Sequence, residues 1–138
     1  MHEPVFFEAH SDIPRQGPGS AASTRRAFSL MNNLPKRPII LDIGCGTGMQ
    51  TLELARLSRG RVVALDNHQP FLDELRRRAE RAGLAGRVET VNGSMFSLDF
   101  GNYRFDTGSP NYALHNLGYL VIWSEGAIYL IGFERGLR

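Results

Sequence analysis

The sequence predicts an α/β domain built on a doubly wound parallel sheet. Two short apolar runs, Ile39–Ile43 and Val62–Leu65, are typical of strands that are covered on both faces. Each run is followed by a stretch with apolar residues at helical spacing. A strand–helix–strand–helix order implies parallel strands that are joined by right-handed crossovers.

Length and composition favour one domain over residues 1–138, because 42% of the residues are hydrophobic and can form a core. The formal charge of +2 is too small to indicate a nucleic-acid partner. The single cysteine excludes an internal disulfide, and no apolar run approaches the roughly 18 residues that a membrane span needs. The first residues do not resemble a secretion signal, so we expect a cytoplasmic protein without a membrane partner.

An N-terminal arm and one helix are expected before the first strand. Prolines and glycines between positions 14 and 19 break regular structure, so residues 1–19 are predicted to form an arm or lid, and residues 20–138 the α/β core. Ser20 or Ser23 can cap a helix that ends before Pro35. Its apolar residues recur at i, i+3, i+4 and i+7, namely at Ala27, Leu30, Met31 and Leu34.

The remaining elements follow in order. After a glycine-rich loop, Thr47 and Gln50 have the spacing of a capping box for the next helix. The second strand ends on Asp66, and a further helix is expected from Pro70 to Gly83. Further strands are predicted at Arg87–Val91 and Leu120–Trp123, separated by a long loop over 101–119.

The glycine spacing after the first strand indicates which ligand the loop suits. Glycines between a strand and a helix let the backbone turn sharply and let a ligand approach main-chain N–H groups. A dinucleotide-binding loop would place its third glycine at position 49, which is Met49, whereas this loop places it at Gly48. Asp42, two positions before the loop, would repel a pyrophosphate but suits the ammonium group of an amino acid. The pattern favours S-adenosylmethionine over NAD.

Structural alternatives remain open for the same residues. The glycine loop could be a tight turn without a ligand, and Asp42 could be a helix-capping or salt-bridged carboxylate. Asp66 could cap the helix that begins at Pro70. Cys45 is expected to be a small packing residue, and His68 either lies beside the ligand's adenine or faces solvent.

Neither a phosphate site nor a metal site is expected. The histidines lack the spacing of metal ligands. Four arginines lie opposite the apolar face of the helix after Asp66, as is typical of a solvated face: Arg76, Arg77, Arg78 and Arg81.

The run from Leu41 to Gly48 resembles the first motif of class I S-adenosylmethionine-dependent methyltransferases, which have a Rossmann-like fold. This resemblance implies that S-adenosylmethionine is the methyl donor and that Asp66 accepts both ribose hydroxyls, since a carboxylate offers two acceptors to a vicinal diol. It also places residues 92–95 beside the adenine.

Two more stretches, 15–20 and 122–129, resemble an uncharacterised subgroup of small-molecule methyltransferases. In that subgroup the first stretch lies near the cofactor mouth, and Ser124 and Glu125 face the sulfonium and the substrate. The implied function is methyl transfer from S-adenosylmethionine to a small molecule, with Glu125 as the candidate catalytic residue. The implied cofactor-binding residues are Asp42, Gly44, Cys45, Gly46, Thr47, Gly48, Asp66, Asn67, Gly93, Ser94, Met95 and Ser124.

Two departures from the family pattern affect these expectations. Residues 107–119 separate the Phe105-Asp106 pair from the fourth strand and have the character of an insertion. The family continues past the position of Arg138 with a helix, a fifth strand and an antiparallel pair, so we expect these C-terminal strands to be missing. The exposed fourth strand would then favour self-association. An alternative function is a non-catalytic S-adenosylmethionine-binding module or an inactive fragment.

Overall fold

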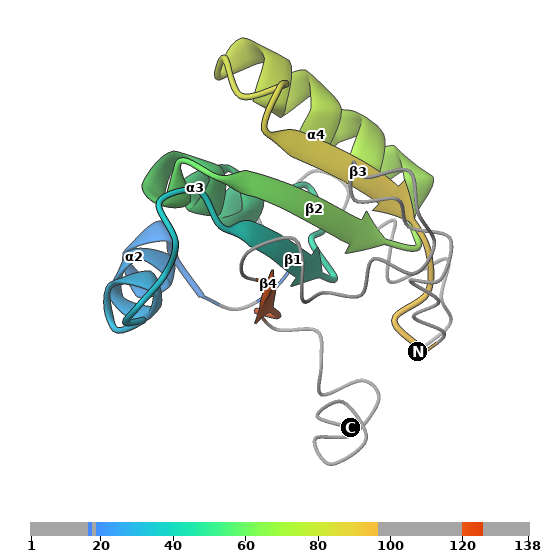
Figure 1. The fold of residues 1–138 in the computed structure, drawn as a ribbon. Helices are drawn as coiled ribbons and strands as arrows, with labels where there is room; N and C mark the ends of the chain where they lie inside the picture. Colours follow the sequence, from blue (N-terminus) through green and yellow to red (C-terminus); the bar gives the residue numbers. More distant parts are fainter. Residues whose placement is uncertain (1–16, 18, 97–119, 126–138) are drawn as a thin grey trace, which may run out of the picture.

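The computed structural model of this chain describes residue 17, residues 19–96 and residues 120–125 (Figure 1). The strands form one parallel sheet in the order β3-β2-β1-β4, which confirms the expected α/β class. In chain order, the elements are α2 (Ala21–Ser29), β1 (Ile39–Ile43), α3 (Met49–Ser58), β2 (Arg61–Asp66), α4 (Gln69–Arg81), β3 (Val88–Asn92) and β4 (Leu120–Trp123).

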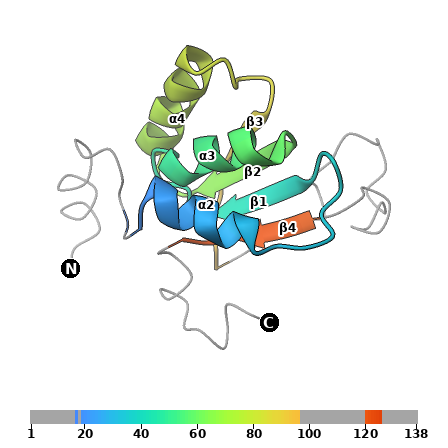
Figure 2. The same ribbon diagram turned by 90° about the vertical axis from the view of Figure 1, so that its left-hand side faces the viewer.

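The core lies on both faces of the sheet. Side chains alternate along a strand, so Ile40 and Val62 face helices α2, α3 and α4, while Leu41 and Val63 belong to a second apolar cluster on the opposite face. Figure 2 shows the three helices gathered over the sheet. All four of these strand residues are at most 1% exposed. The central strands are therefore fixed by apolar burial on both sides.

Helix α2 begins as the sequence predicts but buries a different face. The side chain of Ser20 caps it by accepting a hydrogen bond from the N–H of Ser23. The helix ends at Ser29, where the apolar pattern predicted a longer one, and Ala27 of the predicted apolar face is exposed. Thr24 is instead buried, and contacts of its hydroxyl with the carbonyl of Ser20 and the carboxylate of Glu125 compensate for the loss of water.

The predicted capping box at the start of α3 is wrong. Gly48 occupies the N-cap position, and no side chain caps the helix. The side chain of Gln50 donates to the carbonyl of Cys45 at 3.1 Å, and the hydroxyl of Thr47 accepts from Arg78. Both side chains that would form the box are thus engaged by other groups.

The later elements agree with the sequence to within a residue or two. Pro70 lies in the first turn of α4, and Gly83 follows the end of this helix with a φ of 70°. Strand β3 is shifted by one residue from its predicted bounds, and β4 has the predicted ones.

Most of the predicted arm over 1–19, namely residues 1–16 and 18, lies outside the described residues, as do the predicted insertion over 107–119 and everything after Glu125. None of the helices within the described ranges is long and apolar enough to cross a membrane.

Candidate functional site

The candidate site lies where the parallel strands β1, β2 and β4 end. In open α/β sheets, ligands bind in the crevice beyond the carboxyl ends of the strands. The registers align Asp42 with Ala64 on one side and with Trp123 on the other. Consequently the loop after β1, the end of β2 at Asp66 and Ser124 after β4 lie at one edge of the sheet.

The glycine loop folds back onto the end of β2. The N–H groups of Gly44 and Cys45 both donate to the carbonyl of Leu65, at 2.8 and 3.0 Å. The N–H of Gly46 donates to Asp66 Oδ2 at 2.9 Å. The N–H of Gly48 donates to the carbonyl of Cys45 at 3.0 Å. Because these N–H groups are used within the protein, the glycines serve the turn itself more than they present amides to a ligand.

Glycine is required at Gly48 for two reasons. Its φ of 87° lies in the left-handed region, as do those of Gly44 and Gly46 at 70° and 56°. In addition, a Cβ at Gly48 would lie 2.1 Å from Leu75 Cδ1, so a side chain there would force the buried side chain of Leu75 to shift. Cys45 is buried in the core as predicted, and this burial raises the pKa of its thiol.

Asp66 joins the loops after β1 and β2. Its Oδ2 accepts from Gly46, and its Oδ1 accepts from the N–H of His68 at 3.0 Å. His68 is the N-cap residue of α4 and stacks edge-on against Phe71, with ring centroids 4.5 Å apart. Burial raises the pKa of Asp66, while the N–H donors of Gly46 and His68 oppose this rise. Since a carboxylate has about four lone-pair sites, Asp66 keeps acceptor capacity for a ligand.

Asp42 is completely buried beneath the loop. Its Oδ2 accepts from the hydroxyl of Thr51 at 2.6 Å, whereas Oδ1 has no hydrogen-bond partner among the residues that the structure describes. Burial raises the pKa of Asp42 to about 7, and the nearby carboxylates of Glu125 and Asp66 contribute to this rise. A buried polar atom without a partner is rare in folded proteins, so Asp42 has an unusual environment for a carboxyl group.

The predicted residues after β4 are engaged by neighbouring elements. Ser124 Oγ donates to the carbonyl of Ile43 at 3.4 Å, which ties it to the end of β1. Glu125 Oε2 accepts from Thr24 Oγ1 at 2.9 Å and from Trp123 Nε1 at 3.2 Å. The candidate catalytic carboxylate therefore also links β4 to helix α2.

The residues predicted to lie beside the adenine come to the same edge. The N–H of Gly93 donates to the carbonyl of Asp66 at 3.0 Å, which joins the end of β3 to the end of β2. Ser94 Oγ accepts from the N–H of Phe96, and Met95 packs against the second apolar cluster. Asn67 is exposed at the end of β2.

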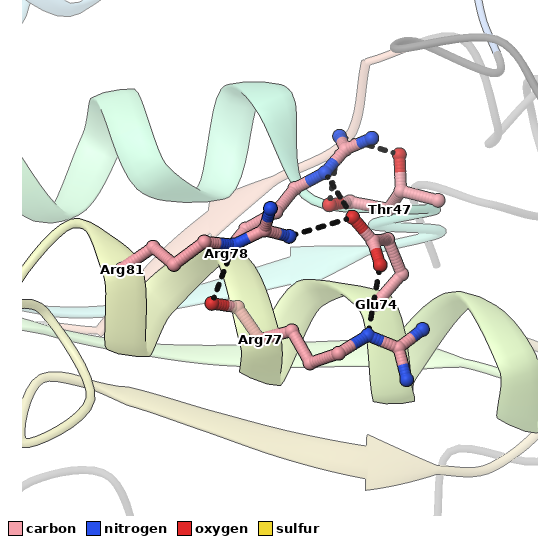
Figure 3. Close-up of polar contacts among 5 residues, drawn as sticks. All are labelled: Thr47, Glu74, Arg77, Arg78 and Arg81. Carbon is pink, nitrogen blue, oxygen red and sulfur yellow. Dashed lines mark hydrogen bonds and ion pairs between the residues drawn. The ribbon is translucent and has the colours of Figure 1, made fainter.

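The prediction that all four arginines of α4 form a solvated face is wrong for Arg78. Its side chain is 23% exposed, compared with 63% for Arg77, and it donates to Thr47 of the glycine loop (Figure 3). The signal was present in the sequence: Arg78 follows Phe71 by seven positions and Leu75 by three, which places it beside the buried face of the helix.

The described residues contain no group of three or more His, Cys, Asp or Glu side chains that could hold a metal ion. The absence of a metal from the whole protein stays a prediction.

Comparison with known proteins identifies the family. The profile of a family described as a methyltransferase domain matches residues 40–120, which include the glycine loop and Asp66. The chain belongs to the class I S-adenosylmethionine-dependent methyltransferases. The expected family and its Rossmann-like fold are thereby confirmed, and the NAD alternative loses support.

The chain spans only about a fifth to a quarter of the length of the two relatives described next. Over 68 residues the chain is 34% identical to a sterol 24-C-methyltransferase of Eremothecium gossypii. The aligned region covers 49% of this chain and 18% of that enzyme. Over 82 residues it is 32% identical to a ribosomal protein L11 methyltransferase of Gloeobacter violaceus. This aligned region covers 59% of this chain and 26% of that enzyme.

A solved structure agrees with the fold and with the cofactor class. The S-adenosylmethionine-dependent methyltransferase from Thiobacillus denitrificans, in complex with S-adenosyl-L-homocysteine, superposes with a TM-score of 0.58 and 26% identity. The match covers 64% of this chain and 36% of that one.

Proposed function

We propose that this chain binds S-adenosylmethionine at the carboxyl ends of β1 and β2 and serves methyl transfer to a small molecule. The observation that carries the proposal is the hydrogen bond between the N–H of Gly46 and Asp66 Oδ2, at 2.9 Å. It brings the glycine loop and a carboxylate together at the edge of the sheet where this fold accepts ligands.

The electrostatics of the site suit a cationic ligand. Asp42, Asp66 and Glu125 are close enough for the latter two to raise the pKa of Asp42. A ligand that carries an ammonium and a sulfonium group would relieve this concentration of negative charge. Because Asp42 is 0% exposed, we propose that it acts on the ammonium group through its charge and not by direct contact.

The other cofactor residues have complementary proposed roles. Asp66 would accept the ribose hydroxyls with its remaining lone pairs, and Asn67 would lie next to it. Gly93, Ser94 and Met95 would flank the adenine. The loop from Gly44 to Gly48 would support the amino-acid end of the cofactor, and Ser124 would lie on the opposite side.

Catalysis in this proposal is mainly positional. The bound cofactor supplies an electrophilic methyl group, so the protein has to align the acceptor and exclude water. Glu125 stays the candidate base for an acceptor that must lose a proton. Its hydrogen bonds from Thr24 and Trp123 fix the carboxylate at the end of β4.

A small molecule is the proposed acceptor. The sterol 24-C-methyltransferase relative supports this choice by its name, while the ribosomal protein L11 methyltransferase relative makes a protein acceptor the competing outcome. Transfer of a labelled methyl group to small-molecule pools and, separately, to protein would distinguish the two.

Calorimetry tests the cofactor proposal directly. We expect the protein to bind S-adenosylhomocysteine, and Asp66→Ala to weaken binding by about 1 to 3 kcal/mol, because buried hydroxyls lose their acceptor. Asp73→Ala is the matched control, since Asp73 is a carboxylate on α4 whose side chain is 45% exposed. Absent binding by the parent protein, or equal binding of NAD, would refute the proposal.

A further inference from the structure

Helix α4 makes a polar contact with the glycine loop that the proposed cofactor roles do not use. Arg78 Nη1 donates to Thr47 Oγ1 at 2.9 Å and lies 3.4 Å from the carbonyl oxygen of Thr47 (Figure 3). Thr47 is 2% exposed. The hydroxyl of Thr47 therefore faces α4, so this residue is suited to hold the loop in place.

The glycine loop needs contacts that restrict its backbone, because it is rich in glycine. Gly44, Gly46 and Gly48 all adopt positive φ, and glycine loses more conformational freedom on ordering than any other residue. On one side the loop is tied to β2 through the carbonyl of Leu65 and through Asp66. On the other side, α4 provides the Arg78 contact together with the packing of Leu75 against Gly48.

Glu74 orients the arginine. Arg78 Nε donates to Glu74 Oε1 at 3.0 Å, one helical turn away, while Nη1 of the same guanidinium reaches Thr47. Arg77 occupies the other oxygen of Glu74, also at 3.0 Å, and Figure 3 shows it directed away from the loop. A planar guanidinium can serve both partners with a fixed geometry, which a lysine ammonium cannot.

We propose that Arg78 is a positioning residue: held by Glu74, it fixes Thr47 and thereby keeps the glycine loop in the conformation that receives the cofactor. The claim that this conformation receives the cofactor rests on the proposed function. The claim that Arg78 holds the loop in place is independent of it. Preorganisation of this kind strengthens binding because less ordering remains to be done when the ligand arrives.

The first experiment compares Arg78→Met with Arg77→Met. The two substitutions remove the same charge from adjacent positions, and both lose an ion pair with Glu74, but only the first loses the contact with Thr47. For Arg78→Met we expect about ten-fold weaker binding of S-adenosylhomocysteine by calorimetry and faster hydrogen exchange at the amides of Gly46 and Gly48. Arg77→Met should leave both quantities close to those of the parent.

A double-mutant cycle separates positioning from general stability. Thr47→Val removes the acceptor hydroxyl with little change in volume, so Arg78→Met should weaken binding no further in the Thr47→Val background. Arg78→Lys, which keeps the charge and most of the side chain, covers the case in which Arg78→Met does not fold. Arg78→Lys should still bind S-adenosylhomocysteine several-fold more weakly than the parent, because an ammonium cannot contact Glu74 and Thr47 with the fixed geometry of the guanidinium.

The outcomes are distinct. If Arg78→Met matches Arg77→Met in both affinity and loop exchange, or if its effect is undiminished in the Thr47→Val background, the positioning role is overturned. If the parent fails to bind S-adenosylhomocysteine, the proposed function fails, and loop exchange alone still decides whether Arg78 holds the loop.

Discussion

At the scale of single residues, Asp42 has the least favourable environment of the described carboxylates. It is 0% exposed, and its Oδ1 has no hydrogen-bond partner in the described part of the chain. Burial raises its pKa from 3.8 to about 7. An acid whose pKa is raised in the folded state destabilises the fold once it ionises, so the contribution of Asp42 to stability falls as pH rises between these two values.

We therefore expect Asp42→Asn to become more stable relative to the parent as the pH increases. From pH 5 to pH 8 the variant should gain about 2 kcal/mol in unfolding free energy, because it carries no charge that the fold must desolvate. Urea denaturation across this range, without cofactor, measures the difference. Asp73→Asn is the control for an exposed carboxylate, and parallel profiles for the parent and Asp42→Asn would contradict the expectation.

Glu125 illustrates how one residue can serve two purposes. Sequence reasoning placed it at the end of a strand near the sulfonium, and the structure adds that its Oε2 accepts from Thr24 and Trp123. These two hydrogen bonds tie α2 to β4, whereas a role of Glu125 in catalysis stays a prediction.

At the scale of elements, the glycine loop depends on its close contact with α4. Both Gly48 and Gly83 have positive φ, at 87° and 70°. A Cβ on Gly48 would collide with Leu75, whereas a Cβ on Gly83 would meet nothing within 4 Å. An alanine would therefore have an unfavourable backbone conformation at both positions, but a steric clash only at Gly48.

The pair allows a matched test of loop packing. Gly83→Ala should cost about 1 kcal/mol for its backbone alone, and Gly48→Ala about 1 to 3 kcal/mol more, because the buried side chain of Leu75 must repack. Chemical denaturation of the two variants gives both values. Equal losses would mean that Leu75 adjusts freely and that the loop does not depend on its contact with α4.

At the scale of the whole molecule, β3 and β4 are the two edge strands of the described sheet, and β4 carries the strongly exposed apolar side chain of Ile122. It pairs with β1 on one side, and within the described part of the chain no strand pairs with its other edge. Ile122 is 62% exposed, while Val121 is buried in the main core. The side chain available to another molecule is therefore Ile122, since a charge at Val121 would disrupt the core.

Self-association through this strand stays a prediction. If it occurs, Ile122→Lys should shift the protein toward monomer in light scattering, because an exposed apolar strand edge recruits other chains and a charge opposes this. Leu30→Lys is the matched control, since Leu30 is 61% exposed at the end of α2. A parent protein that is already monomeric at micromolar concentration would rule out the association.

The sequence by itself determined the architecture of this methyltransferase domain and which residues form the candidate site at the edge of its sheet. A short apolar run such as Ile39–Ile43 indicates a buried strand, whatever its position in the sheet. The glycines that follow it at alternate positions indicate a sharp turn into a helix. These signals are local, so they can be recognised without knowledge of the remaining fold. The same is true of Asp66, because the end of the apolar run already indicated that this residue ends the strand β2.

Only the tertiary structure decided which side chains meet across the fold. Thr24 and Glu125 are separated by 101 positions in the chain, and Arg78 and Thr47 by 31. Such contacts depend on the strand order and on how α2 and α4 pack over the sheet, and local spacing encodes neither. For the same reason the sequence could not show that Asp42 would lose all contact with water, because burial is a property of the assembled layers.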